Sequence, residues 1–338
     1  MEGTSAATSG VVALERLLAV LPSFGVDGAD VCRVVGVELA ALRRRQRVPV
    51  TIETAIWTEA ARRRPDLPLG IAAAERCFAL GIHESTLYEY LGCFAPTLRD
   101  ASAAMCARQR LETDAFVTTF VETDDRCVAR VEPVSPHVDV SWDRVEFGML
   151  RMLKEARRLT DCEPTPLQVS LRRADDRHRE AFERAFGAPV DFGAAHDTMS
   201  FGLECLDSPL LRSNPPLHAE IVRIADQELA SLAPAQQWPV LLATVERLVI
   251  EGDLSAAAVA GWMGVSSEAL HRLIRERGLS WNEVVDSIRR PRAERLLRDP
   301  SVGVAEVGYQ LGFASPASFT RAFRRWTGMS PEEFRRST

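Results

Sequence analysis

One pattern occurs twice near the end of the chain, and it constrains the fold of that part more than any other feature. The two copies cover residues 258–274 and 306–323. They align at an offset of 48 residues up to a glycine and at an offset of 49 beyond it, where Leu270 matches Phe319. One inserted residue in a turn explains the change. The duplication predicts that the same supersecondary unit is built twice.

Each copy predicts a short helix, a glycine turn and a second helix. Gly264 and Gly312 stand where the chain leaves the first helix through a left-handed conformation, which glycine adopts without steric cost. Ser266 and Ser315 then stand at N-cap positions. Pro316 follows at the first helical position, where its missing N–H costs nothing.

Small residues precede each turn and would let the two helices of a copy cross closely. They are Ala260 with Gly261 in the first copy and Gly308 in the second. This is the plan of a helix-turn-helix unit.

The second helix of each copy has a polar face opposite its apolar one. Spacings of three, four and seven residues define that face, and its members are Glu268, His271, Arg272 and Arg275 in the first copy and Ala317, Thr320, Arg321 and Arg324 in the second. Ser267, at the start of the first of these helices, joins the candidate DNA-binding set. Paired recognition helices would show such faces. A helical bundle with solvated arginines is the alternative, and the duplication argues against it.

The distribution of charge permits a nucleic-acid partner although the net charge is −6. From Trp238 onward there are 14 arginines against 12 acidic residues, a net of +2, so the earlier part carries −8. The acidity therefore belongs to the first part of the chain.

The length of 338 residues predicts two domains. Two prolines and polar residues interrupt helical patterns near residue 233, so we place a first domain at 1–232, a linker at 233–239 and a second domain at 240–338. The helix-turn-helix units would cover about 254–277 and 302–326, within six or seven short helices.

The first domain is predicted to be α+β, helix-rich with a small sheet, and the second to be all-α. The apolar patterns predict helices at 11–21, 30–45, 52–63, 97–111, 142–159 and 175–186. Strands are predicted within 116–134, where a turn at 123–125 joins two of them, and at 167–171 and 199–203.

Residues 304–335 resemble the signature of the AraC/XylS regulators, from Val304-Ala305-Glu306 through Ser330-Pro331-Glu332-Glu333-Phe334-Arg335. The resemblance implies two helix-turn-helix subdomains joined by a linker helix, here about 281–297. Their recognition helices would enter successive major grooves of double-stranded DNA, about 34 Å apart. Independently, Ser330 with Glu333 forms a predicted capping box.

Two positions depart from the family pattern. Pro316 and Ala317 stand where relatives often carry polar base readers, so readout there would rest on Arg321 and Thr320. Pro291, near the middle of the linker helix, would remove a helical hydrogen bond and kink the helix.

The first domain is similar to the arabinose-binding-like effector domain found in one branch of this family. The similarity lies in residues 186–193 and 206–210, and it implies binding of a small molecule or dimerisation. Candidate effector-binding residues are His83, Tyr88, Tyr90, Trp142 and Arg151. Arg151 would suit a carboxylate ligand if it points inward. Ordinary core packing is the alternative for all five.

Other chemistry finds no support in the sequence. Motifs such as G-x-S-x-G, G-x-G-x-x-G and H-E-x-x-H are missing, and the seven cysteines never form C-x-x-C. We therefore expect no enzyme activity, metal or cofactor. No stretch is apolar enough to span a membrane, and we expect a cytoplasmic protein.

These observations favour a sequence-specific transcriptional regulator modulated by a small-molecule effector. We expect an activator that contacts RNA polymerase and forms a homodimer through its first domain. A constitutive dimeric DNA-binding regulator without effector is one alternative, and an enzyme tethered to DNA is another.

Overall fold

The computed structural model describes residues 8–83, 86–123, 125–134, 140–232, 254–263, 265–298 and 302–337, with 241–242, 244–245 and 248–249. The chain divides into two compact units, one ending at Ser231 and one beginning at Leu232. We call them the N-terminal and C-terminal units. The linker predicted at 233–239 lies outside the described residues.

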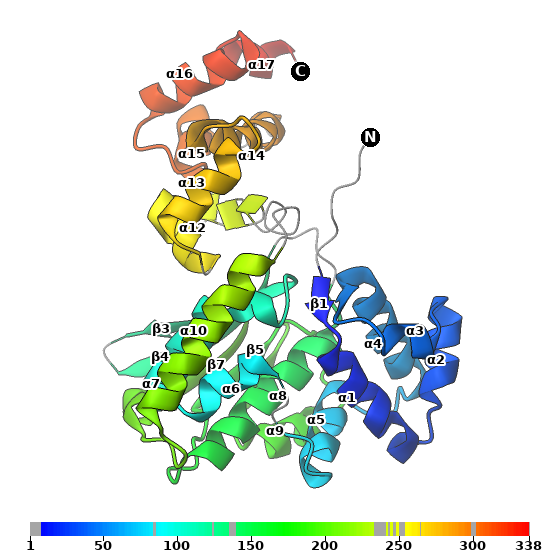
Figure 1. Ribbon diagram of the computed structural model, residues 1–338. Coiled ribbons are helices and arrows are strands. Elements are labelled where there is room, and N and C mark those ends of the chain that lie inside the picture. Colours follow the sequence, from blue (N-terminus) through cyan, green and yellow to red (C-terminus); the bar gives the residue numbers. More distant parts are fainter. Residues whose placement is uncertain are drawn as a thin grey trace. The chain divides into compact units, whose positions relative to one another are not determined.

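The N-terminal unit is mainly helical. Its helices are α1 (Val12–Val20), α2 (Gly28–Val35), α3 (Leu39–Leu42), α4 (Val50–Arg63), α5 (Leu69–Ala79), α6 (Leu87–Cys93), α7 (Leu98–Ala107), α8 (Trp142–Leu159), α9 (Arg179–Phe186) and α10 (Pro215–Ser231), with 3-10 turns η1 (Leu21–Phe24), η2 (Gln109–Leu111) and η3 (Leu203–Asp207). Figure 1 shows α8 among α5, α9 and the strands, and α5 and α9 both contact it. Helix α8 thus forms the centre of this unit.

A five-stranded sheet supports these helices. Its strands, β3 (Phe116–Glu122), β4 (Arg126–Pro133), β5 (Gln168–Leu171), β6 (Val190–Phe192) and β7 (Asp197–Gly202), lie in the order β3-β4-β7-β5-β6. All neighbours are antiparallel except β5 and β6. Alternate residues of β4, among them Ala129 and Val131, enter the core as the period of two requires. A separate short pair joins β1 (Thr8–Gly10) to β2 (Arg47–Pro49).

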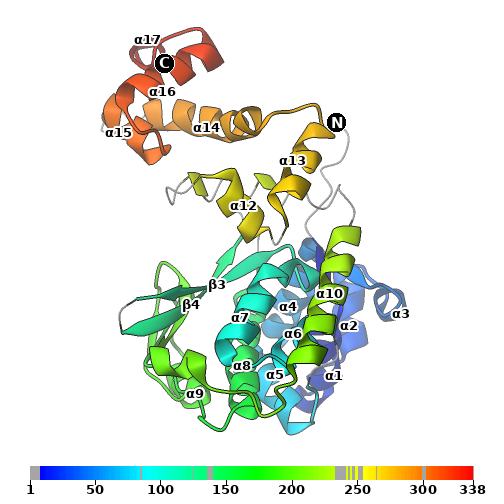
Figure 2. The same cartoon turned by 60° about the vertical axis from the view of Figure 1, so that its left-hand side comes forward.

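The described part of the C-terminal unit is helical. It contains α12 (Ala256–Trp262), α13 (Ser267–Arg275), α14 (Trp281–Leu297), α15 (Val304–Gln310), α16 (Pro316–Thr327) and α17 (Pro331–Ser337). Figure 2 shows α14 running from α13 at one end to α15 and α16 at the other, and α14 contacts all three. The apolar faces of these helices share one core.

The predicted fold class is confirmed, and helices α8 and α14 have the predicted bounds. The helix predicted at 30–45 is wrong, because Gly36 adopts φ +82° and ends α2. The helix predicted from residue 175 begins later, at Arg179. Its expected first turn is instead an Asx-type turn in which the Arg177 N–H donates to Asp175 Oδ1 at 3.2 Å.

Candidate nucleic-acid interface and internal cavity

The second helix-turn-helix unit, α15 and α16, forms as its sequence predicts. Gly312 turns the chain at φ +72°. Ser315 Oγ accepts from the Ser318 N–H at 3.2 Å and caps α16, with Pro316 in the first turn. Gly308 is buried, and a Cβ there would stand 3.0 Å from the Cβ of Phe319. The missing side chain therefore allows α15 and α16 to cross closely.

In the first unit, α12 and α13, serine side chains cap both helices, whereas α15 of the second unit has Gly303 at its N-cap and no side-chain cap. Ser255 Oγ accepts from the Ala258 N–H at 3.0 Å, and Ser266 Oγ accepts from the Ala269 N–H at 3.1 Å. Gly261 is exposed with nothing within 4 Å of an added Cβ, so the small buried residue here is Ala260. The prediction for Gly264 lies outside the described residues.

Helix α13 separates its two faces cleanly. Leu270, Leu273 and Ile274 are buried in the core of the unit. The residues predicted to face outward are all exposed, namely Ser267, Glu268, His271, Arg272 and Arg275. The described contacts of these side chains are limited to a long hydrogen bond of 3.4 Å from Arg275 Nε to the His271 carbonyl. This face is therefore open to a partner.

Helix α16 presents the equivalent face with one difference. Phe319, Ala322 and Phe323 are buried, and the outward positions are Ala317, Thr320, Arg321 and Arg324. Three of these four are exposed, but Thr320 is half-buried. Its hydroxyl donates to the Pro316 carbonyl of the preceding turn at 3.0 Å, so that donor is already in use.

The arginines of the C-terminal unit fall into two groups according to their contacts. Arg325 pairs with Asp286 of α14 at 2.7 Å, and Arg335 donates to the carbonyls of Leu297 and Val302. Such contacts hold helices together. By contrast, Arg272, Arg321 and Arg324 form no ion pair with any described residue. Their guanidinium groups are therefore exposed on the two equivalent faces and free of ion pairs with the described residues.

The linker helix α14 sets the separation of the two helix-turn-helix units within the C-terminal unit. Its 17 residues span about 25 Å at 1.5 Å per residue. Pro291 lies inside it on the exposed side, and the helix continues through that position to Leu297. From the middle of α14, Arg289 lies over the ring of Phe313 at 4.3 Å and donates to the Gly312 carbonyl at 3.0 Å. Arg289 therefore ties α14 to the turn of the second unit.

The last helix, α17, carries the predicted capping box. The Ser330 N–H and Oγ both contact Glu333 Oε2 at 2.7 Å, and the Glu333 N–H donates to Ser330 Oγ at 3.3 Å. These bonds lower the pKa of Glu333. The Phe334 ring packs edge-on against Phe323, which fixes α17 on the core.

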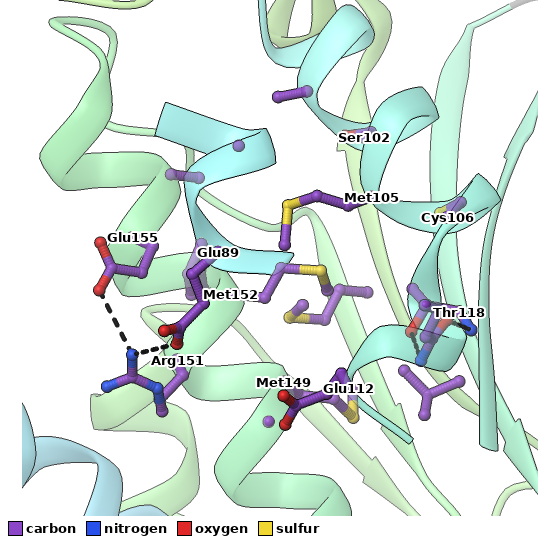
Figure 3. A pocket seen from close by; sticks show the side chains of 18 of the residues that line it. Glu89, Ser102, Met105, Cys106, Glu112, Thr118, Met149, Arg151, Met152 and Glu155 are labelled. Carbon is purple, nitrogen blue, oxygen red and sulfur yellow. Dashed lines mark hydrogen bonds and ion pairs between the residues drawn. The ribbon is translucent and has the colours of Figure 1, made fainter. Parts of the chain in front are cut away.

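A cavity of about 230 Å³ lies inside the N-terminal unit, between α6, α7, α8 and the sheet. Its wall is mainly apolar. Four of the seven methionines of the chain contribute to it, namely Met105, Met149, Met152 and Met199. Figure 3 shows the labelled methionines and the polar residues Glu89, Ser102, Glu112 and Glu155 around this space. The cavity has the mixed lining of a small-molecule site.

Two of the five effector candidates from the sequence, Tyr88 and Arg151, line this cavity, whereas His83, Tyr90 and Trp142 do not. Tyr90 lies two residues from Tyr88 and so faces away from it. Its exposed ring stacks on Phe94. Trp142 lies at the surface under Arg172. His83 lies at the rim of the unit, 3.7 Å from Glu155 and against Phe78.

Arg151 points inward, but its donors are occupied. Nη1 donates to the Ile82 carbonyl at 3.1 Å, and Nη2 lies 3.2 Å from Glu89 and 3.5 Å from Glu155. The expectation of a free arginine for a ligand carboxylate therefore finds no support in these contacts. Sequence reasoning missed Glu112, which also lines the cavity, because its partner Arg144 is 32 residues away.

The described residues contain neither a helix that could span a membrane nor a candidate metal site. None of the described helices combines the length and apolar character needed to cross a membrane. Within the same residues, no group of three or more histidine, cysteine or acidic side chains forms a candidate metal site.

The duplicated unit and its linker helix define a protein of the helix-turn-helix class. Residues 259–337 match the family described as "Helix-turn-helix domain", and residues 25–210 match "Arabinose-binding domain of AraC transcription regulator, N-term". The chain belongs to the AraC family of transcription regulators.

Similar proteins include the HTH-type transcriptional regulator GlxA of Rhizobium meliloti, 37% identical over 36% of this chain and 39% of that protein. The ornithine utilization regulator of Pseudomonas aeruginosa is 28% identical over 47% of each chain. The chain thus matches less than half the length of these two relatives. An HTH-type transcriptional regulator of Mycobacterium tuberculosis is 26% identical over 96% of both chains. The solved structure of the regulator CdpR from Pseudomonas aeruginosa is 22% identical and covers 80% of this chain and 87% of that one, with a TM-score of 0.36.

Proposed function

We propose that the chain regulates transcription by reading DNA with α13 and α16 in successive major grooves. One observation carries the proposal: the two helices present arginines at equivalent exposed positions, Arg272 with Arg321 and Arg275 with Arg324. Arginines on an exposed helix face suit bidentate contacts to guanine and to phosphate. The length of α14 is compatible with grooves about 34 Å apart.

The two reading faces differ in chemistry. In α13, Glu268 can accept from the amino group of cytosine, and His271 adds a further polar contact. In α16 the corresponding positions are Ala317 and Thr320, whose hydroxyl donates to the Pro316 carbonyl. We therefore propose that the first unit supplies more base specificity and that the second depends on Arg321 and on phosphate contacts.

Binding to a duplex selected from a randomised DNA pool tests the reading faces. Arg272→Ala and Arg321→Ala should each weaken specific binding by roughly 1–3 kcal/mol while the fold is retained. The matched control is Arg177→Ala, which removes an exposed arginine paired with Asp175 in the N-terminal unit. Unchanged binding by both α13 and α16 variants would contradict the proposal.

We further propose that the N-terminal unit binds an effector in its cavity and mediates a homodimer, and that the regulator is an activator that contacts RNA polymerase. The cavity supports the effector role over a constitutive regulator. A reporter promoter with the selected duplex upstream tests whether the protein activates or represses transcription. Expression should rise when the protein is present, and a fall would identify a repressor. Sedimentation of the full chain tests the dimer.

A further inference from the structure

The size of the cavity limits what it can hold. An engineered protein cavity of about 150 Å³ accepts one benzene molecule. A space of about 230 Å³ therefore suits a molecule of roughly ten non-hydrogen atoms. The thioethers of Met105, Met149 and Met152 give it an adaptable apolar wall. This favours a small ligand with an aromatic or alkyl body.

The arginines that line the cavity are already matched by acceptors. Arg16 binds both carboxylate oxygens of Glu89, at 2.5 and 2.8 Å, and Arg151 also contacts that carboxylate. Arg144 donates from Nε to Glu53 at 2.7 Å and from Nη2 to Glu112 at 3.1 Å. An anionic ligand would have to compete with these carboxylates for the arginines.

One oxygen of the Glu112 carboxylate remains able to accept a hydrogen bond. Glu112 Oε1 accepts from Arg144 at 3.1 Å, whereas Oε2 accepts no hydrogen bond from the described residues. Arg16, Arg144 and Arg151 face the carboxylates of Glu53, Glu89 and Glu112 at this end of the cavity, and of these arginines Arg144 is the one that donates a described hydrogen bond to Glu112. Burial raises the pKa of Glu112, and the neighbouring carboxylates of Glu89 and Glu53 add to the rise.

Tyr88 adds a second polar group beside this carboxylate. Its side chain lines the cavity, and its hydroxyl has no hydrogen-bond partner within the described residues. Two further polar residues of the wall, Gln109 and Thr118, bind each other. The Thr118 N–H donates to Gln109 Oε1 at 2.6 Å, and Gln109 Nε2 donates to Thr118 Oγ1 at 3.2 Å. Free polar capacity therefore remains at Glu112 and Tyr88, and also at Glu155 Oε1, which has no hydrogen bond from a described residue but lies 3.5 Å from Arg151 Nη2.

We propose that the cavity binds a small primary amine with an apolar body, whose protonated nitrogen donates to Glu112 Oε2. The ammonium would donate a charge-assisted hydrogen bond to the Glu112 oxygen that Arg144 does not contact, and the methionine wall would enclose the body of the molecule. This inference rests on the proposed effector role and names the chemical class of the effector.

The test is calorimetric titration of the full chain with 2-phenylethylamine, beside phenylacetate and ethylbenzene as anionic and apolar analogues of similar size. The amine should bind at least about tenfold more tightly than either analogue, since a hydrogen bond to a buried charge is worth that much. Glu112→Gln should remove this preference, and Glu183→Gln, which changes an exposed carboxylate on α9, should leave it intact.

Ser102→Phe, which fills the cavity from α7, provides a second variant if Glu112→Gln does not fold. It should abolish binding of the amine. Phenylacetate binding as tightly as the amine, no binding of the amine, or an unchanged preference in Glu112→Gln would overturn the assignment. If the amine binds as expected but leaves the affinity for the selected duplex unchanged, the ligand class stands and the proposed regulation fails.

Discussion

Gly308 of α15 lies under the side chain of Phe319 of α16, so that a Cβ on the glycine would stand 3.0 Å from the Cβ of the phenylalanine. Gly308→Ala should therefore force the two helices apart. We expect a loss of about 1–3 kcal/mol in unfolding free energy from the overpacked crossing, reduced by up to about 1 kcal/mol of gained helix propensity. Urea denaturation of the C-terminal unit within the full chain measures it.

Gly261→Ala is the matched control in the other copy. Gly261 is exposed in α12, and nothing lies within 4 Å of an added Cβ. The substitution should leave stability unchanged or raise it by up to about 1 kcal/mol. Equal losses in the two variants would show that the glycine in α15 is not required by the crossing.

These two glycines also show what the sequence could predict. Local signals sufficed for the duplicated unit, because caps such as Ser315 and the periodicity of α16 act within a few residues. The expectation that Gly261 also lies at the crossing is wrong: the offset of 48 residues pairs the buried Gly308 with the buried Ala260, and the exposed Gly261 with the exposed Tyr309.

For a similar reason, the cavity could not be predicted from local sequence patterns. It depends on contacts between distant residues, such as Arg151 with Glu89, 62 residues apart. The sequence placed Tyr88 and Tyr90 in one candidate set, but residues two apart on a helix face different sides. Gly36 likewise ended a helix whose apolar pattern continued across it.

The buried carboxylate of Glu89 should be essential for the stability of the N-terminal unit. It accepts from Arg16 of α1 and Arg151 of α8, whose side chains are 6% and 8% exposed. Glu89→Gln removes the charge partner that the two arginines share, although Arg151 keeps a longer contact with Glu155 at 3.5 Å. We expect a loss of about 3–5 kcal/mol in thermal or urea unfolding.

Glu59→Gln is the control for Glu89, since Glu59 also binds two arginines, Arg62 and Arg63. The Glu59 side chain is only 10% exposed, but its arginine partners are 71% and 22% exposed and can be solvated without it. Ion pairs with exposed partners contribute less than about 1 kcal/mol. A loss from Glu59→Gln as large as that from Glu89→Gln would contradict the role given to the burial of the arginines.

Glu112 should make the N-terminal unit less stable as the pH rises. Its folded-state pKa is raised by burial, with Glu89 and Glu53 adding to the rise and Arg144 and Arg16 opposing it. The folded state therefore holds the proton more tightly than the unfolded chain. Stability is full below the ordinary glutamate pKa of about 4.3 and falls as the pH rises through the raised value.

Glu112→Gln removes this titration. As the pH rises above the ordinary glutamate pKa of about 4.3, the stability of the variant should therefore fall less than that of the unchanged protein. Thermal unfolding measured at several pH values checks the prediction. Parallel pH profiles for the two proteins would mean that Glu112 is ionised in the folded state as readily as in the unfolded chain.

Guanine methylation interference on the selected duplex tests the two-helix account most directly. The unchanged protein should give two patches in successive major grooves, about 10 base pairs apart. Arg272→Ala should lose one patch and Arg321→Ala the other. A single patch, or the same change in both variants, would contradict the assignment of α13 and α16 as two reading helices.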